Sequence, residues 1–296
     1  CRSRAGPPQM CGGGHVGLIS GTVSPFMQQW ILPDGLTGSP VVYIAVAVVA
    51  FGLTAVAKGG FGGVGILGVP LMMMVVPDDA SKFVLGLWLP LLVLCDIWTV
   101  KSFAREWTFR PLLLLSPWVV VGLFAGAMLL GIITDQAVKV FVGALAIMFA
   151  VLEWTRARAT HKLEEHGKGG VWTPTWWTAA PFGLGVGIST MIAHSAGVIT
   201  AIYLLAQRLD RRTFAGTSGR FYLVVNTVKI PYYAQLGIVN TETLIKGIWL
   251  IPLAPLGVWL GAMLNRRMSP AAFNRAINVL LLLSGVFLLY QNVGGQ

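Results

Sequence analysis

Charged residues are scarce in this chain. They make up only 11% of its 296 residues, while 55% are hydrophobic, and a typical soluble domain has about 25% charged residues. A soluble fold of this length would need more polar surface. The composition therefore excludes an ordinary soluble domain and indicates an integral membrane protein.

Cysteine and histidine are scarce as well, with three cysteines and four histidines. Cys1, Cys11 and Cys95 form no CxxC pair, and no histidine lies beside them at the spacing of a zinc site. We therefore expect no disulfide framework, no metal site and no cofactor.

Sequence motifs of ATP-driven pumps are absent as well. There is no Walker motif and no phosphorylated-aspartate signature, which favours a secondary transporter over a primary pump. A membrane-embedded enzyme would need a nucleophile with a base, or a metal cluster, and only His194 among the histidines lies within the hydrophobic sequence. We predict that the chain is not an enzyme; an enzyme and a structural or assembly protein are the alternatives from other classes.

Long apolar runs, by contrast, recur along the whole chain. About 20 apolar residues cross a hydrocarbon core of ~30 Å at about 1.5 Å per residue. We predict an all-α polytopic membrane protein with ten hydrophobic segments, over residues 40–57, 63–76, 83–100, 111–133, 136–153, 178–193, 195–207, 214–236, 243–264 and 272–291.

These segments fall into two halves of five. We predict a loosely structured N-terminal tail over residues 1–39, rich in Gly, Pro and Ser, and a polar cytoplasmic linker over residues 154–177. The first transmembrane repeat then covers residues 40–153, and the second covers residues 178–291.

The positions of the basic residues indicate how these segments are oriented in the membrane. The formal net charge is +10, but Lys and Arg lie mostly in short loops between apolar runs, which is a topology signal and does not indicate nucleic acid binding. Ten segments place fourteen basic residues on one side and five on the other, whereas eight merged segments would place ten and eight. We therefore predict that both termini lie outside the cytoplasm. Charge leaves open whether segments 63–76 and 195–207 cross fully or re-enter.

Because each half has an odd number of segments, the second half enters the membrane from the opposite side to the first and has the inverted orientation. Gly86 is followed ten residues later by Asp96, and Gly216 is followed ten residues later by Asn226. A break rich in small residues precedes each pair, KGGFGGVG in the first half and AHSAGV in the second. We predict a 5+5 inverted repeat with two interrupted or re-entrant segments, a recurring transporter architecture.

The first break combines a basic residue with glycines. Lys58 precedes four glycines within five positions, among them Gly60, Gly62 and Gly63, and each glycine costs a helix roughly 1 kcal/mol relative to Ala. A helix that restarts after Gly63 would expose N–H groups, which attract anions. Ligand contact and tight helix packing both remain open for these glycines.

The second break contains His194, Ser195 and Gly197. The segments on either side would reach only about 24 and 20 Å, too short to span ~30 Å, so a re-entrant hairpin is expected. His194 and Ser195 could there donate to a substrate. The alternative for His194 is a hydrogen-bonded buried residue.

Segment 214–236 is unusually polar. It holds Thr217, Ser218, Arg220, Asn226 and Lys229, and a central basic residue costs about 2.5 to 3.5 kcal/mol in hydrocarbon. Asn226 and Lys229 share a helix face, while Arg220 is half a turn out of phase with Lys229. We predict an anion site near the midplane between the two breaks, with Lys229 supplying the charge.

Asp96 is the only carboxylate well inside the segments of the first half. We predict that it carries a coupling proton or pairs with Lys229. The alternative is a structural ion pair with no role in transport.

These motifs together resemble the sulfite exporter TauE/SafE family of membrane permeases. The likeness rests on KGGFGGVGILGVPL, AHSAGVITAIYLL and AGTSGRFYLVVNTVKIPYY, and it covers roughly residues 40–291. It implies export or uptake of small sulfur-containing anions such as sulfite or organosulfonates in a bacterial inner membrane. A non-sulfur anion is the alternative. The expected partners are the anionic substrate, the lipid bilayer and a coupling proton or cation, with no nucleic acid.

The resemblance also implies site residues. The family motifs fall on Gly59, Gly60, Gly62, Gly63, His194, Ser195, Gly197, Gly216, Thr217, Ser218, Asn226 and Lys229. This chain departs from the family pattern at Ser195 and Val198, where Gly and Pro are common, and in the LGLW that includes Gly86. These departures leave the particular substrate open.

Overall fold

The structure is a computed structural model, and it describes residues 24–36, 38–60, 67–165, 173–207 and 209–267 together with residues 282, 286 and 290. Within these ranges the chain forms helices and no strands, which confirms the predicted all-α class. Most of segment 272–291, most of the N-terminal tail, Gly62 and Gly63 lie outside the described residues.

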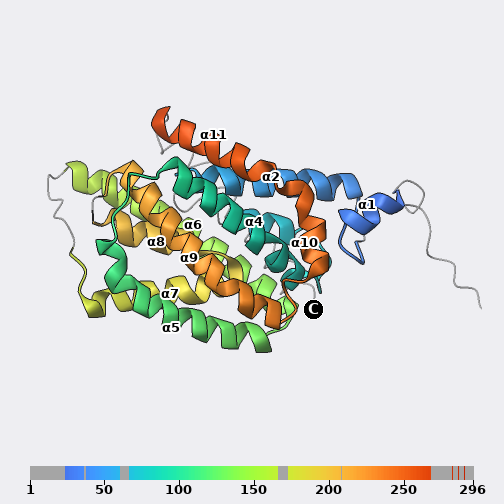
Figure 1. Cartoon of the computed structure of the whole chain (residues 1–296). Coiled ribbons are helices and arrows are strands. Elements are labelled where there is room, and N and C mark those ends of the chain that lie inside the picture. Colours follow the sequence, from blue (N-terminus) through green and yellow to red (C-terminus); the bar gives the residue numbers. More distant parts are fainter. Residues whose placement is uncertain are drawn as a thin grey trace, which may run out of the picture.

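The helices follow the predicted hydrophobic segments closely. They are α1 (Pro25–Trp30), α2 (Pro40–Lys58), α3 (Gly68–Met73), α4 (Ser81–Ser102), α5 (Arg110–Ile132), α6 (Asp135–Glu165), α7 (Trp176–Ala193), α8 (Ala196–Leu205), α9 (Arg211–Gln235), α10 (Thr241–Gly247), the 3-10 turn η2 (Ile248–Leu250) and α11 (Leu253–Arg267). Figure 1 shows them as one bundle.

Three elements differ from the prediction. Helix α1 lies within the predicted loosely structured N-terminal tail. Helix α6 continues through Glu165, into the predicted linker, because the sequence after Glu153 is rich in helix-forming Ala, Arg, Lys, Leu and Glu and has no Gly or Pro before Gly167. The predicted segment 243–264 is a broken pair, α10 and α11, bent by 50°. Pro252 has no N–H to continue the helical hydrogen bonds, so the run ends there.

Three described helices are long and apolar enough to cross a membrane, namely α2, α4 and α5, and the bent pair α10–α11 adds a fourth if it is one span. Buried residues make up 61% of the apolar window in α4 but only 33% in α5. Helix α4 therefore lies in the interior of the bundle, while α5 presents an apolar face outward. The full count of ten segments remains a prediction.

Small residues let the outer helices pair closely. A Cβ atom on Gly187 of α7 would lie 2.5 Å from the carbonyl carbon of Gly122 in α5, and one on Gly261 of α11 would lie 2.1 Å from the carbonyl oxygen of Val56 in α2. Membrane helices use such positions to bring their backbones together. The pairs α5–α7 and α2–α11 flank the centre of the bundle (Figure 1).

Helices α4 and α9 pack together in the centre. A Cβ on Gly86, near the start of α4, would meet the carbonyl oxygen of Ile238, just after α9; a Cβ on Gly216, near the start of α9, would meet that of Glu106, just after α4. Each central helix thus begins against the loop that follows the other, so the two helices run antiparallel.

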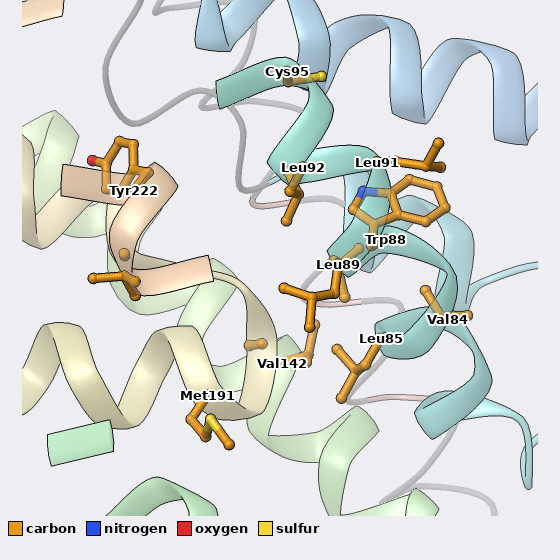
Figure 2. Close-up of a cluster of buried hydrophobic side chains, with 14 of the residues drawn as sticks. Val84, Leu85, Trp88, Leu89, Leu91, Leu92, Cys95, Val142, Met191 and Tyr222 are labelled. Atoms are coloured by element: carbon orange, nitrogen blue, oxygen red, sulfur yellow. The ribbon is translucent and has the colours of Figure 1, made fainter. Parts of the chain in front are cut away.

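Apolar side chains of α4 fill the space around this crossing. Val84, Leu85, Trp88, Leu89, Leu91 and Leu92 are all buried, and Figure 2 shows them projecting from several sides of the helix. Trp88 packs edge-on against Phe51 of α2, with ring centroids 5.9 Å apart. This apolar packing fixes where the polar residues of α4 and α9 meet.

Candidate functional site

One face of α9 carries a buried polar stripe. Tyr222, Asn226, Lys229 and Tyr233 are spaced by four, three and four residues, which places them along one side of a helix. All four are buried. Buried polar groups need partners, and α4, α2 and the break between α7 and α8 supply most of them.

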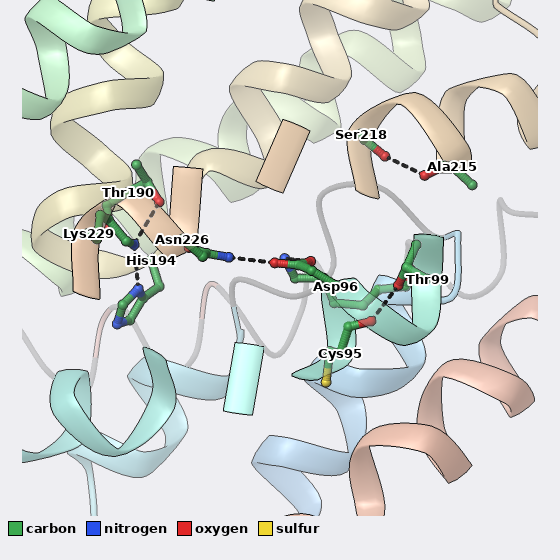
Figure 3. Close-up of polar contacts among 10 residues, drawn as sticks. Cys95, Asp96, Thr99, Thr190, His194, Ala215, Ser218, Asn226 and Lys229 are labelled. Carbon is green, nitrogen blue, oxygen red and sulfur yellow. Dashed lines mark hydrogen bonds and ion pairs between the residues drawn. The ribbon is translucent and has the colours of Figure 1, made fainter. Parts of the chain in front are cut away.

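Asp96 of α4 lies at the centre of the site with no exposed surface. Its Oδ1 accepts from the Lys58 ammonium at 2.6 Å. Its Oδ2 accepts from the Asn226 amide at 2.7 Å (Figure 3). The two residues that the sequence aligned as repeat partners, Asp96 and Asn226, are therefore in direct contact. The predicted pairing of Asp96 with Lys229 is wrong, because Lys229 lies one turn further along α9 and bonds to residues of the α7–α8 break.

Lys58 reaches this carboxylate from the last turn of α2. Its ammonium also lies 4.3 Å from the centre of the Tyr222 ring, a cation–π distance. Helix α2 ends at Lys58, as its glycines predict, and Gly60 adopts φ +120°, a backbone conformation that favours glycine. The Asn265 amide donates to the Gly60 carbonyl at 2.7 Å. A Cβ on Gly60 would lie 2.7 Å from that amide nitrogen.

Lys229 forms a second cluster at the carboxyl end of α7. Its ammonium donates to the Thr190 carbonyl at 2.9 Å, to the Thr190 hydroxyl at 3.2 Å and to His194 Nδ1 at 2.9 Å. Three N–H groups therefore have three acceptors, and all of these acceptors are neutral. Among the described residues, no carboxylate forms an ion pair with Lys229.

His194 links this cluster to α4. It ends α7 in the left-handed conformation, with φ 51°, and its Nε2 lies 3.0 Å from the Leu85 carbonyl. A carbonyl only accepts, so Nε2 carries the proton, and Nδ1 is then free to accept from Lys229. The hydrogen-bond network thus assigns the neutral Nε2–H tautomer. These contacts match the hydrogen-bonded interpretation of His194, and its predicted contact with substrate stays a prediction.

A model of one protein family matches most of the chain, including this site. The model of the family described as Sulfite exporter TauE/SafE matches residues 44–288. The chain belongs to this family. Comparisons with curated proteins and with solved structures gave no match. The TauE/SafE match spans Lys58, Asp96, His194, Asn226 and Lys229, so every residue of the two clusters named here lies within it.

Other predicted site residues of this TauE/SafE permease lie apart from Lys229. The Thr217 hydroxyl accepts from the Thr108 N–H at 3.0 Å, and the Ser218 hydroxyl donates to the Ala215 carbonyl at 3.2 Å. Both residues lie near the start of α9, three to four turns from Lys229, and they bond to nearby backbone groups. Arg220 donates to carbonyls of the loop after α4, away from Lys229 as its offset predicts.

The break between α7 and α8 falls where the TauE/SafE motif predicts it. Ser195 is the residue just before α8, and its hydroxyl donates to the Ala193 carbonyl at 2.9 Å and does not cap the helix. Gly197 lies in the first turn of α8. These residues adjoin His194 in the chain and share its end of the break.

Sequence reasoning missed three residues of the site. Thr190 accepts hydrogen bonds from Lys229, the ring of Tyr222 lies against the Lys58 ammonium, and Tyr233 is fully buried and donates its hydroxyl to the Met191 carbonyl. The signal for the two tyrosines was available, because both share the helix face of Asn226 and Lys229. Thr190 carries no comparable signal.

Proposed function

We propose that this TauE/SafE member is a secondary permease for small anions, with sulfur-containing anions such as sulfite or organosulfonates as its substrates. The observation that carries the proposal is the charge of the buried site. Lys58, Asp96 and Lys229 supply two ammonium groups and one carboxylate inside the bundle. One positive charge is left over, and an anion would neutralise it.

Lys229 is the centre of this proposal. The other two buried lysines of the described chain face carboxylates, Lys139 facing Asp78 and Lys246 facing Asp34 and Glu242. The partly buried Lys58 pairs with Asp96. An ammonium held only by neutral groups is expensive inside a membrane protein. A bound anion would supply the counter-charge, with its oxygens replacing Thr190 and His194 around the ammonium.

The charge balance also favours one class of anion. A single excess positive charge matches a monoanion such as hydrogen sulfite or a sulfonate, while a dianion would leave a negative charge in a low-dielectric site. The N–H groups of Ala196 and Gly197, at the start of α8, are further donors that we propose, because helix amino-termini attract anions. The Ser195 N–H already donates to the Ser189 carbonyl at 3.3 Å.

The antiparallel crossing of α4 and α9 supports the proposed inverted repeat. Gly86 and Gly216 lie ten residues before Asp96 and Asn226, and both pack against the loop after the opposite helix. In such repeats the substrate site lies between the halves near the midplane. We propose that alternating access moves one half against the other around the Asp96–Asn226 contact, in a bacterial inner membrane with the linker in the cytoplasm.

The test of this function replaces Lys229 by Met, which keeps most of the apolar side chain. We expect sulfite affinity on purified, monodisperse protein to fall by about ten- to a hundredfold, because a hydrogen bond to a charged group contributes about 1.5 to 3 kcal/mol. Flux in proteoliposomes, measured with sulfite, thiosulfate, sulfonates and carboxylates, should fall with it.

The matched control is Lys246→Met, which removes a buried lysine that is paired with carboxylates at an end of the bundle. It should lower stability and leave sulfite affinity unchanged. Unchanged affinity and flux in Lys229→Met would contradict the site, and absence of saturable flux of every anion in the wild type would contradict the function.

A further inference from the structure

Two buried hydroxyl groups near Lys58 have no hydrogen-bond partner. The Tyr222 hydroxyl of α9 and the Thr200 hydroxyl of α8 lie close enough to interact with each other, but within the described residues neither has a hydrogen bond of normal geometry. Thr200 is fully buried and Tyr222 is buried. An unmade buried hydrogen bond costs about 1 to 3 kcal/mol, so such a pair calls for an explanation.

Lys58 has unused donors at the same place. Its ammonium carries three N–H groups, and within the described residues the Asp96 carboxylate is its one hydrogen-bond acceptor. The Lys58 side chain is 14% exposed, whereas Asp96 has no exposed surface. The ammonium also lies over the ring of Tyr222. Lys58 can therefore donate to a further acceptor without losing Asp96, which Lys229 cannot do with its three occupied donors.

We propose a second anion station formed by Lys58, Tyr222 and Thr200, distinct from the Lys229 station. This inference rests on the proposed function and adds a step to it. Tyr222 precedes Lys229 by seven residues on the same face of α9, so the two stations are about 10 Å apart along the helix. The second station lies toward the Arg211 end of α9.

The chemistry of the second station suits an oxyanion. Sulfite and sulfonates have several oxygens that accept hydrogen bonds at once, and two hydroxyls with an ammonium can serve them together. The hydroxyls then gain the partner that they lack. Because Asp96 already neutralises Lys58, this station holds an anion more weakly than Lys229 does. Weak, successive sites let an ion leave as well as enter.

The test is the double substitution Tyr222→Phe with Thr200→Val, which removes both hydroxyls and retains the ring and the branched side chain. Since neither hydroxyl has a partner, thermal stability should be unchanged or raised. We expect proteoliposome flux of sulfite and of methanesulfonate to fall roughly tenfold or more. Equilibrium sulfite affinity, which reports mainly the Lys229 station, should stay within about threefold of the wild type.

A matched control is Ser81→Ala, because Ser81 also has a fully buried hydroxyl without a partner and lies at the start of α4. It should change neither flux nor affinity. Wild-type flux in the double variant would overturn the second station, and so would a loss of affinity as large as that of Lys229→Met, since it would indicate a single shared site. Failure of the proposed function is separate, because wild-type protein would then move no anion.

Discussion

The two sides of the buried site differ in their net charge. On the α4 side, Lys58 and Asp96 neutralise each other. On the α7–α9 side, Lys229 is surrounded by Thr190 and His194, which are neutral. The charge of Lys58 is therefore already balanced by a carboxylate, whereas no described carboxylate balances the charge of Lys229. Substitutions on each side test this difference.

The largest effect should come from Asp96→Asn, which leaves the partly buried Lys58 ammonium without its counter-charge. Breaking one partner of a buried pair costs about 3 to 5 kcal/mol of unfolding free energy, measured by thermal or denaturant unfolding in detergent. Glu106→Gln is the control, because its pair with Arg212 is partly exposed and such pairs contribute about 0 to 1 kcal/mol. Equal losses of unfolding free energy in the two variants would contradict a strong stabilising pair between Lys58 and Asp96.

A smaller effect is expected at the glycines that let α4 and α9 pack closely. Gly86→Ala and Gly216→Ala should each lower the unfolding free energy by about 1 to 3 kcal/mol, because the added methyl group meets a backbone carbonyl. Gly52→Ala in α2 is the control, since nothing lies within 4 Å of a Cβ there, and it should stabilise by up to about 1 kcal/mol. A clear difference between Gly86→Ala and Gly216→Ala would argue against matched packing of the two central helices.

The smallest effect is expected from a substitution of Thr190, which contacts Lys229. Thr190→Val removes one of the three acceptors of the ammonium and keeps the carbonyl. We expect a loss of about 0.5 to 1.5 kcal/mol in unfolding free energy. Added sulfite should restore part of that loss, because an anion replaces the missing acceptor. No stabilisation by sulfite in either Thr190→Val or wild type would contradict anion binding beside Lys229.

Much of this architecture was predictable from local sequence. Apolar run length located the long helices within a few residues, and the glycines after Lys58 correctly predicted the end of α2. The break at His194 was predicted too, since the flanking runs are too short to span. Prediction failed where hydropathy alone was used to place a helix end. Pro252 divides one apolar run into α10 and α11. Helix-forming residues extend α6 beyond Glu153, although this stretch is polar.

The amino-acid sequence by itself determined the membrane class, most of the helix ends and the polar face of α9, because these depend on apolar length, glycine and proline, and helical periodicity. Only the tertiary structure decided which charges meet. Asp96 lies far from Lys58, Asn226 and Lys229 in the chain, and the antiparallel packing of α4 and α9 against α2 brings it to the first two and not to the third. Partner choice is a property of that packing, since it depends on distances of a few ångström between helices that spacing along one helix does not contain.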